Sequence, residues 1–194
     1  ENSLGRLWML NRPDSELPKD MPYFVKPDED AETEFRKISS PEEITVVDPA
    51  CGSGHILVYA FELLSKMYIE DGYTGRDAAR LILEKNLSGM EIDPRAGAMA
   101  SFALTMKACE LDSRFLRRGV SPRITVLSRV EFEPEELQYV ENLRNRPELM
   151  DAAAHLDECG SLLTVSSDDL EAIARDLASL AGEETIFGGF AAEK

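Results

Sequence analysis

The feature that most constrains the fold is the segment Asp48-Pro49-Ala50-Cys51-Gly52-Ser53-Gly54, which lies between two apolar runs. Residues 44–47 precede it and favour a buried strand, and residues 56–61 follow it and favour a helix. Strand, glycine loop and helix in this order are typical of a doubly wound α/β sheet. Gly52 and Gly54 can adopt backbone angles that other residues avoid, which lets a ligand approach the main chain closely. The segment therefore predicts a parallel sheet with a ligand site after its first strand.

Size and composition limit the class of protein. With 194 residues, 43% of them hydrophobic, the chain can bury one substantial core. No apolar run is long enough to span a membrane, and the first residues lack the pattern of a signal peptide. Cys51, Cys109 and Cys159 are odd in number and widely spaced, which argues against disulfides and a zinc site. We therefore expect a cytoplasmic protein with free thiols and no metal.

The formal net charge of −16 bears on the partners that the chain can bind. An acidic surface repels the phosphate backbone of nucleic acids, so the chain alone should bind DNA poorly. If the parent protein acts on DNA, we expect segments absent from this sequence to supply the basic surface.

Hydrophobic periodicity divides the chain into three parts. Four prolines interrupt the first forty residues, so the segment 1–43 is expected to be irregular and to wrap the sheet. Residues 44–132 form the expected α/β core, with strands at 44–47, 87–92 and 124–127 and helices at 55–69, 75–85 and 94–109. Residues 133–194 are expected to form an acidic helical segment, with helices at 134–143, 147–159 and 168–180 and a short strand at 162–165.

The ends of the core helices carry recognisable signals. Asp71-Gly72 supplies a C-terminal cap for the first core helix. Thr74 and Asp77 have the spacing of a capping box at the start of the second. Asp93 precedes Pro94 and should cap the third.

A second chemical signal lies at the end of the predicted second strand, in Gly89-Met90-Glu91-Ile92-Asp93. In a doubly wound sheet this strand end lies beside the glycine loop, so an acid there can accept hydrogen bonds from the ribose hydroxyls of an adenosine group. We assign that role to Glu91 rather than to Asp93, and expect Ile92 to offer an apolar edge to the adenine ring.

The loop differs from a dinucleotide site in two ways. It is not Gly-x-Gly-x-x-Gly, and the acid follows at about twice the usual spacing of about 20 residues. Asp48 would also repel a pyrophosphate, whereas it suits a ligand with an ammonium and a sulfonium group. These points favour S-adenosylmethionine over a nicotinamide dinucleotide.

Three other side chains have alternative interpretations. Trp8 could bind a ligand, but an apolar anchor is the simpler role. Cys51 could be a nucleophile at a helix start, although without a paired base it is expected to pack under the loop. His55 could be a general base, but the first turn of a helix disfavours its cation, so a packed or capping histidine is preferred.

Taken together, the motifs resemble the first two motifs of adenine-specific DNA methyltransferases, especially the phage-exclusion (BREX-type) and related restriction-linked enzymes. Besides the two motifs, the resemblance includes residues 2–8, 55–61, 86–93 and 102–108. It covers residues 1–130 well and the acidic remainder loosely. The family implies a Rossmann-like fold that binds S-adenosylmethionine, and its cofactor contacts carry over to Asp48, Pro49, Ala50, Cys51, Gly52, Gly54, Glu91 and Ile92.

The catalytic motif of the family, Asn-Pro-Pro-Tyr or Asp-Pro-Pro-Tyr, does not occur in this sequence, so no catalytic residue is assigned. In the family this motif holds a flipped adenine. We therefore expect the cofactor half of a methylase that acts in restriction-modification or phage defence, with DNA bound through regions not present here. The acidic helices are either a solvated face or a surface for protein partners in a defence complex.

Two other functions stay open on the sequence. A non-catalytic module that binds S-adenosylmethionine as a sensor or scaffold would lack the catalytic motif by nature. A nucleotide-dependent oxidoreductase would instead bind a nicotinamide dinucleotide.

Overall fold

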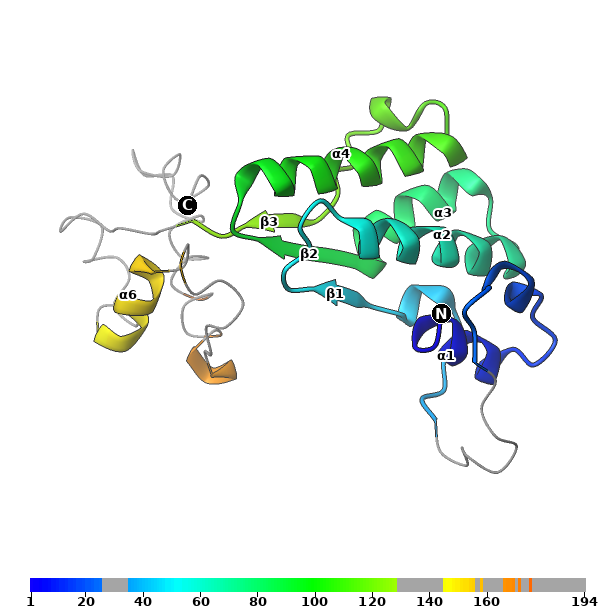
Figure 1. Cartoon of the computed structure of the whole chain (residues 1–194), viewed down its shortest axis with the longest axis horizontal. Coiled ribbons are helices and arrows are strands. Elements are labelled where there is room, and N and C mark those ends of the chain that lie inside the picture. Colours follow the sequence, from blue (N-terminus) through cyan, green and yellow to red (C-terminus); the bar gives the residue numbers. More distant parts are fainter. Residues whose placement is uncertain are drawn as a thin grey trace. The chain divides into compact units, whose positions relative to one another are not determined.

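A three-stranded parallel sheet forms the centre of the folded core in the computed structural model. The structure describes residues 1–25, 35–128, 145–155, 158, 166–169, 171 and 175. It divides into two compact units, Glu1–Val126 and Leu127–Lys194. The strands are β1 (Val46–Asp48), β2 (Leu87–Glu91) and β3 (Ile124–Val126), in the spatial order β1-β2-β3 (Figure 1).

The register of the sheet brings the two predicted motifs to one edge. Asp48 is opposite Gly89, and Glu91 is opposite Val126. Because all three strands are parallel, the glycine loop after β1 and the acid at the end of β2 lie at the same carboxyl end. The strands lie within one to two residues of their predicted bounds, and the expected partial Rossmann-like methyltransferase fold is confirmed.

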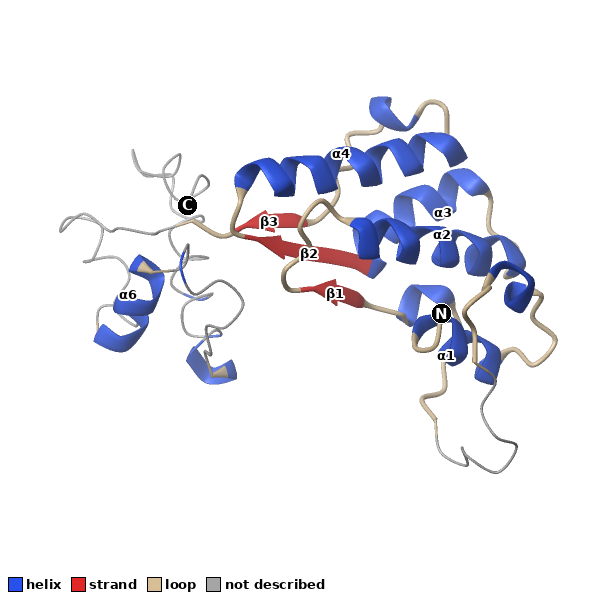
Figure 2. Cartoon of the chain, in the orientation of Figure 1, coloured by secondary structure: helices blue, strands red, loops and turns tan. Residues whose placement is uncertain are grey.

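Three helices, α2 (His55–Glu70), α3 (Gly75–Leu81) and α4 (Pro94–Leu111), lie on one side of the sheet (Figure 2). The helix expected at 75–85 begins where predicted, but a π-helical turn, Ile82–Asn86, replaces its last part. On the opposite side of the sheet, Val47 is 59% exposed. Within the described residues, the sheet is thus covered on the side of the helices.

The predicted helix ends are largely confirmed. The Asp93 side chain accepts a hydrogen bond from the Arg95 N–H at 2.8 Å, and Pro94 is the first residue of α4. Gly72, just after α2, has a φ of +89°. Thr74 accepts from the Asp77 N–H at 3.2 Å as expected. In a full capping box, the second side chain accepts from the backbone N–H of the cap residue. Here Asp77 accepts instead from the side-chain hydroxyl of Thr74, at 2.6 Å.

The N-terminal segment is more regular than predicted. Residues Leu4–Asn11 form helix α1, and Leu17–Asp20 and Pro41–Glu43 form short 3₁₀ turns. No proline interrupts this helix, because the first proline of the chain, Pro13, comes after it. Trp8 is fully buried, and its indole N–H donates to Glu70 in α2 at 2.6 Å. The expectation that Trp8 is an apolar anchor is confirmed.

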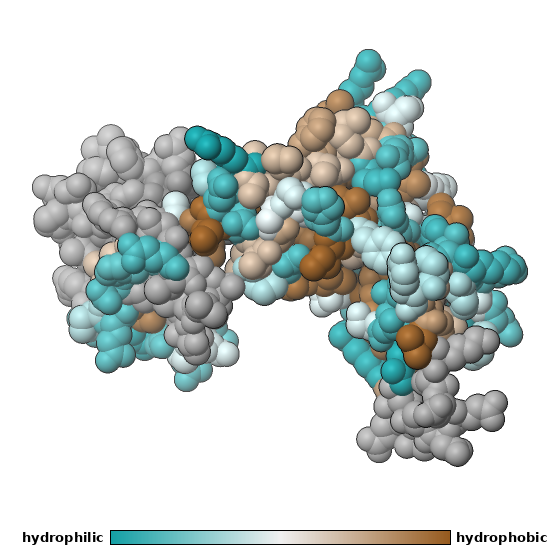
Figure 3. All heavy atoms as spheres, in the orientation of Figure 1, coloured by the Kyte–Doolittle hydropathy of each residue, from teal (hydrophilic) through white to brown (hydrophobic). Residues whose placement is uncertain are grey.

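The outer surface of α4 is unusually apolar. No charged residue occurs between Arg95 and Lys107, and the side chains of Met99, Phe102 and Met106 are all exposed. Figure 3 shows tan to brown surface over this helix. No helix in the described ranges is long and apolar enough to cross a membrane.

The second unit is described only in part. Its helix α6, Pro147–Ala154, corresponds to the first half of the helix expected at 147–159. Residues 167–169 are helical, at the start of the helix expected at 168–180. The helix expected at 134–143 and the strand expected at 162–165 lie outside the described residues.

Candidate functional site

The glycine loop between β1 and α2 is tied to the end of the neighbouring strand. The Cys51 N–H donates to the Met90 carbonyl at 2.9 Å, and the Gly54 N–H donates back to the Cys51 carbonyl at 2.8 Å. Gly52 and Gly54 have φ values of +55° and +86°, in the left-handed region that favours glycine. Both glycines of the predicted loop therefore adopt the backbone that the motif required.

Small residues let α4 approach the loop and the sheet. A Cβ on Gly54 would lie 2.9 Å from the Ala100 Cβ, and one on Gly97 would lie 2.8 Å from Val126 Cγ2. A Cβ on Gly89 would lie 2.8 Å from Ile124 Cδ1. Gly89, Gly97 and Ala100 are not among the residues that the sequence predicted for the site. The run of small residues at the start of α4 is the signal that could have identified two of them.

Glu91 connects the two motifs directly. Its Oε2 accepts a hydrogen bond from the Gly52 N–H at 2.6 Å, and its Oε1 accepts from the N–H groups of Ile92 and Asp93 at 2.9 and 3.1 Å. The backbone N–H groups of Asp93 and Gly52 hold the pKa of Glu91 below its ordinary value, because they stabilise the ionised carboxylate. The site thus contains a carboxylate that is ionised at neutral pH.

Four other predicted residues lie in the same loop or next to Glu91. Asp48 ends β1, and its Oδ1 accepts from the Ala50 N–H at 3.2 Å. Pro49 and Ala50 are exposed at the outer side of the loop, and Ile92 is 47% exposed beside Glu91. All eight residues predicted for the cofactor site lie at the carboxyl end of the sheet.

The structure supports the packing role of Cys51 over a nucleophilic one. Its side chain is buried, and its Sγ is one of the atoms that a Cβ on Gly89 would meet, at 3.0 Å. Burial first, and then the charges of Asp48 and Glu91, raise the pKa of the Cys51 thiol. A raised pKa disfavours the thiolate that a nucleophile requires.

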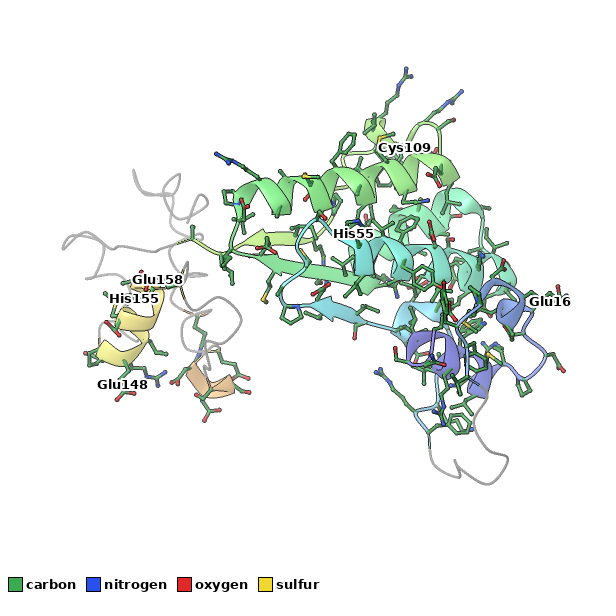
Figure 4. All side chains as sticks on the ribbon, viewed as in Figure 1. Glu16, His55, Cys109, Glu148, His155 and Glu158 are labelled. Atoms are coloured by element: carbon green, nitrogen blue, oxygen red, sulfur yellow. The ribbon has the colours of Figure 1, made fainter. Side chains whose placement is uncertain are left out.

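His55 begins α2 next to the loop (Figure 4). It is exposed, and its Nδ1 lies 3.0 Å from the Ser53 hydroxyl. The expectation of a packed or capping histidine is therefore wrong, because the side chain is exposed, the N-cap of α2 is Gly54, and the ring pairs with a loop hydroxyl instead. Among the residues that the structure describes, the Ser53 hydroxyl is the one polar group within hydrogen-bond distance of the His55 ring.

Comparison with known proteins identifies the family. Residues 28–125 match the family described as MmeI, DNA-methyltransferase domain. The chain belongs to this family. It is 34% identical over 193 residues to the adenine-specific methyltransferase BrxX of Escherichia coli O9:H4 (strain HS), and the matched residues make up 96% of this chain. It is 39% identical over 136 residues, 64% of this chain, to the adenine-specific methyltransferase PglX of Lacticaseibacillus casei (strain Zhang).

These relatives are much longer than the chain. The matched residues span 16% of BrxX and 11% of PglX. The resemblance to BREX-type adenine-specific methyltransferases that the motifs indicated is confirmed. Membership in a methyltransferase family implies a cofactor of the S-adenosylmethionine type.

Proposed function

We propose that the carboxyl end of the sheet binds S-adenosylmethionine. Asp48 and the glycine loop would hold the methionine part, Glu91 would accept from the ribose, and Ile92 would contact the edge of the adenine. The observation that carries this proposal is the hydrogen bond of 2.6 Å between Glu91 and the Gly52 N–H. It joins the glycine loop and the acid at the ends of two neighbouring parallel strands, where cofactors bind in sheets of this type.

The residues present fit such a ligand. A Cβ on Gly52 would meet no atom within 4 Å, so the space beside the loop is open for a group that approaches the backbone. The carboxylate of Asp48 suits the ammonium of the methionine part, and it would repel the pyrophosphate of a dinucleotide. The exposed Ile92 adds an apolar surface next to Glu91.

For the longer protein, we propose methyl transfer to the exocyclic amine of adenine in DNA, in phage defence or restriction-modification. The names of the two relatives support adenine as the target. S-adenosylmethionine supplies the methyl group when it is bound. The residues of this chain would contribute by holding the ligand in one orientation, which lowers the entropic part of the barrier. Contacts with DNA and with protein partners are proposed for other parts of the protein.

Calorimetric titration of the chain tests the cofactor proposal. We expect saturable binding of S-adenosylmethionine and of its demethylated product S-adenosylhomocysteine, and no binding of a nicotinamide dinucleotide. Glu91→Ala and Asp48→Ala should each weaken binding roughly 10- to 100-fold, the usual effect of losing a hydrogen bond to a charged group. Glu110→Gln is a matched control, because Glu110 is exposed on α4 and pairs with Lys107 at 3.1 Å.

Unchanged affinity in both Glu91→Ala and Asp48→Ala would show that the site lies elsewhere. Binding of the nicotinamide dinucleotide would favour the oxidoreductase. Methylation assays on the longer protein, with the same substitutions, would separate a catalytic enzyme from a sensor module that binds the cofactor without turnover.

A further inference from the structure

Glu91 makes a hydrogen bond to the glycine loop, in addition to the ribose contact proposed for it. Its Oε2 reaches across from the end of β2 to the Gly52 N–H at 2.6 Å, although the two residues are 39 positions apart in the sequence. Both of its atoms belong to this chain, so the bond is part of the organisation of the loop itself.

In the described part of the chain, no neighbouring side chain packs against the Cβ side of Gly52. A Cβ built on this residue would meet no atom within 4 Å, whereas Cβ atoms on Gly54 and Gly89 would meet neighbours at 2.9 Å or closer. The neighbouring Cys51 N–H is already bonded to the Met90 carbonyl of β2. The bond to Glu91 thus extends the attachment of the loop to β2 by one residue, at the position that packing leaves open.

The carboxylate has enough acceptor positions for two tasks. An ionised carboxylate can accept about four hydrogen bonds, two on each oxygen. Oε1 accepts from Ile92 and Asp93, and Oε2 accepts from Gly52. One position on Oε2 remains, so a ribose hydroxyl can be bound while Gly52 stays attached.

We propose that Glu91 is a positioning residue that fastens the glycine loop to the end of β2 before the cofactor binds. The ligand then meets a loop already in its binding shape, and the entropy of ordering the loop is not lost on binding. This inference rests on the proposed cofactor site for its functional meaning. The fastening itself is a property of the free protein and can be measured without any ligand.

Amide hydrogen exchange of the free, ¹⁵N-labelled chain tests the proposal. The Gly52 amide should be protected in the wild-type chain, and Glu91→Gln should speed its exchange roughly 10- to 100-fold. The amide oxygen of a glutamine can keep the two bonds from Ile92 and Asp93, and its amide nitrogen, a donor, then faces the Gly52 N–H. The Gly54 amide, which bonds within the loop, and the variant Glu110→Gln should show no change.

A second measurement covers the case in which Glu91→Gln disturbs the fold. In the unmodified chain, the amide proton shift of Gly52 should follow the ionisation of Glu91, with a midpoint below the ordinary value of 4.5. An unprotected Gly52 amide in the wild type, an exchange rate unchanged in a folded Glu91→Gln, or a Gly52 shift independent of Glu91 would each overturn the proposal.

The two proposals fail in different ways. Protected Gly52 without binding of S-adenosylmethionine would keep the fastening role and reject the cofactor site. Loss of S-adenosylhomocysteine affinity in Glu91→Gln with unchanged Gly52 exchange would keep the ribose contact and reject the fastening.

Discussion

At the scale of single residues, two glycines with nearly the same φ differ in their surroundings. Gly54 in the loop and Gly72 after α2 have φ values of +86° and +89°. A Cβ on Gly54 would lie 2.9 Å from the Ala100 Cβ and 3.0 Å from its Cα, while a Cβ on Gly72 would meet nothing within 4 Å. The pair therefore separates the cost of the left-handed backbone from the cost of a clash.

We predict that Gly72→Ala lowers the free energy of unfolding by about 1 kcal/mol, through backbone strain alone. Gly54→Ala should lower it by about 2–4 kcal/mol, because overpacking against α4 adds to the same strain. Urea denaturation of the two variants measures both values. Equal losses would mean that α4 shifts without cost, and that the loop does not depend on its contact with Ala100.

At the scale of elements, a buried asparagine joins three parts of the chain. Asn86 ends the π-helical turn, and its Nδ2 donates to the carbonyls of Pro41 and Ile44 at 2.8 and 2.6 Å. Its Oδ1 accepts from the Tyr68 hydroxyl of α2 at 2.8 Å. The side chain thus links the segment before β1, the segment before β2 and the helix that follows the loop.

We predict that Asn86→Leu lowers the free energy of unfolding by about 3–5 kcal/mol, because two carbonyls and a hydroxyl lose their partners in the core. Tyr68→Phe, which removes a single hydrogen bond, should cost about 1–2 kcal/mol. Denaturant midpoints of the two variants give the comparison. If Asn86→Leu proved no worse than Tyr68→Phe, water would have to replace the lost partners.

At the scale of the whole molecule, the negative charge is unevenly distributed. Residues 127–194 carry 5 Lys and Arg against 16 Asp and Glu, whereas residues 1–126 carry 16 against 21. The unit that holds the candidate site is therefore much closer to neutral than the net charge of −16 indicates. Several of its carboxylates accept hydrogen bonds in the folded state, and this makes stability depend on pH.

Three carboxyl groups show this effect. Hydrogen bonds from Lys85 and Tyr73 lower the pKa of Glu42, and backbone N–H groups lower that of Glu91. Burial raises the pKa of Glu70, but hydrogen bonds from Trp8, Ser15 and Glu16 outweigh it and lower the pKa overall. Because the unfolded chain binds these protons more readily, the stabilisation is present above the unfolded pKa and is lost as pH falls through the folded one.

We predict that Glu70→Gln lowers the free energy of unfolding by roughly 1–2 kcal/mol at pH 7. The difference from the wild type should shrink as pH falls below about 4.5. Protonated glutamic acid and glutamine then resemble each other. Urea unfolding followed by the fluorescence of Trp8, the single tryptophan, measures both chains. A difference that stays constant down to pH 3 would show that the charge of Glu70 has no part in anchoring α1.

Much of the site followed from local patterns. The loop 48–54, the acid at 91 and the cap at Asp93 are each encoded within a few neighbouring residues, and each was found where the pattern placed it. The missed helix α1 lay in a segment that the prolines after it made look irregular. The π-helical turn at Ile82–Asn86 was also missed, and there the Asn86 side chain makes contacts with residues more than 40 positions earlier.

By itself, the sequence determined the order of strand, glycine loop and helix, the acidic end of the second strand, and through them the family. These features depend on periodicity and on backbone preferences that act over a few residues. Only the tertiary structure decided that Glu91 reaches Gly52, that Ala100 packs against Gly54, and that the Cys51 side chain is buried. Those contacts join residues far apart in the chain, and they form only when the sheet aligns its strand ends and the helices pack against it.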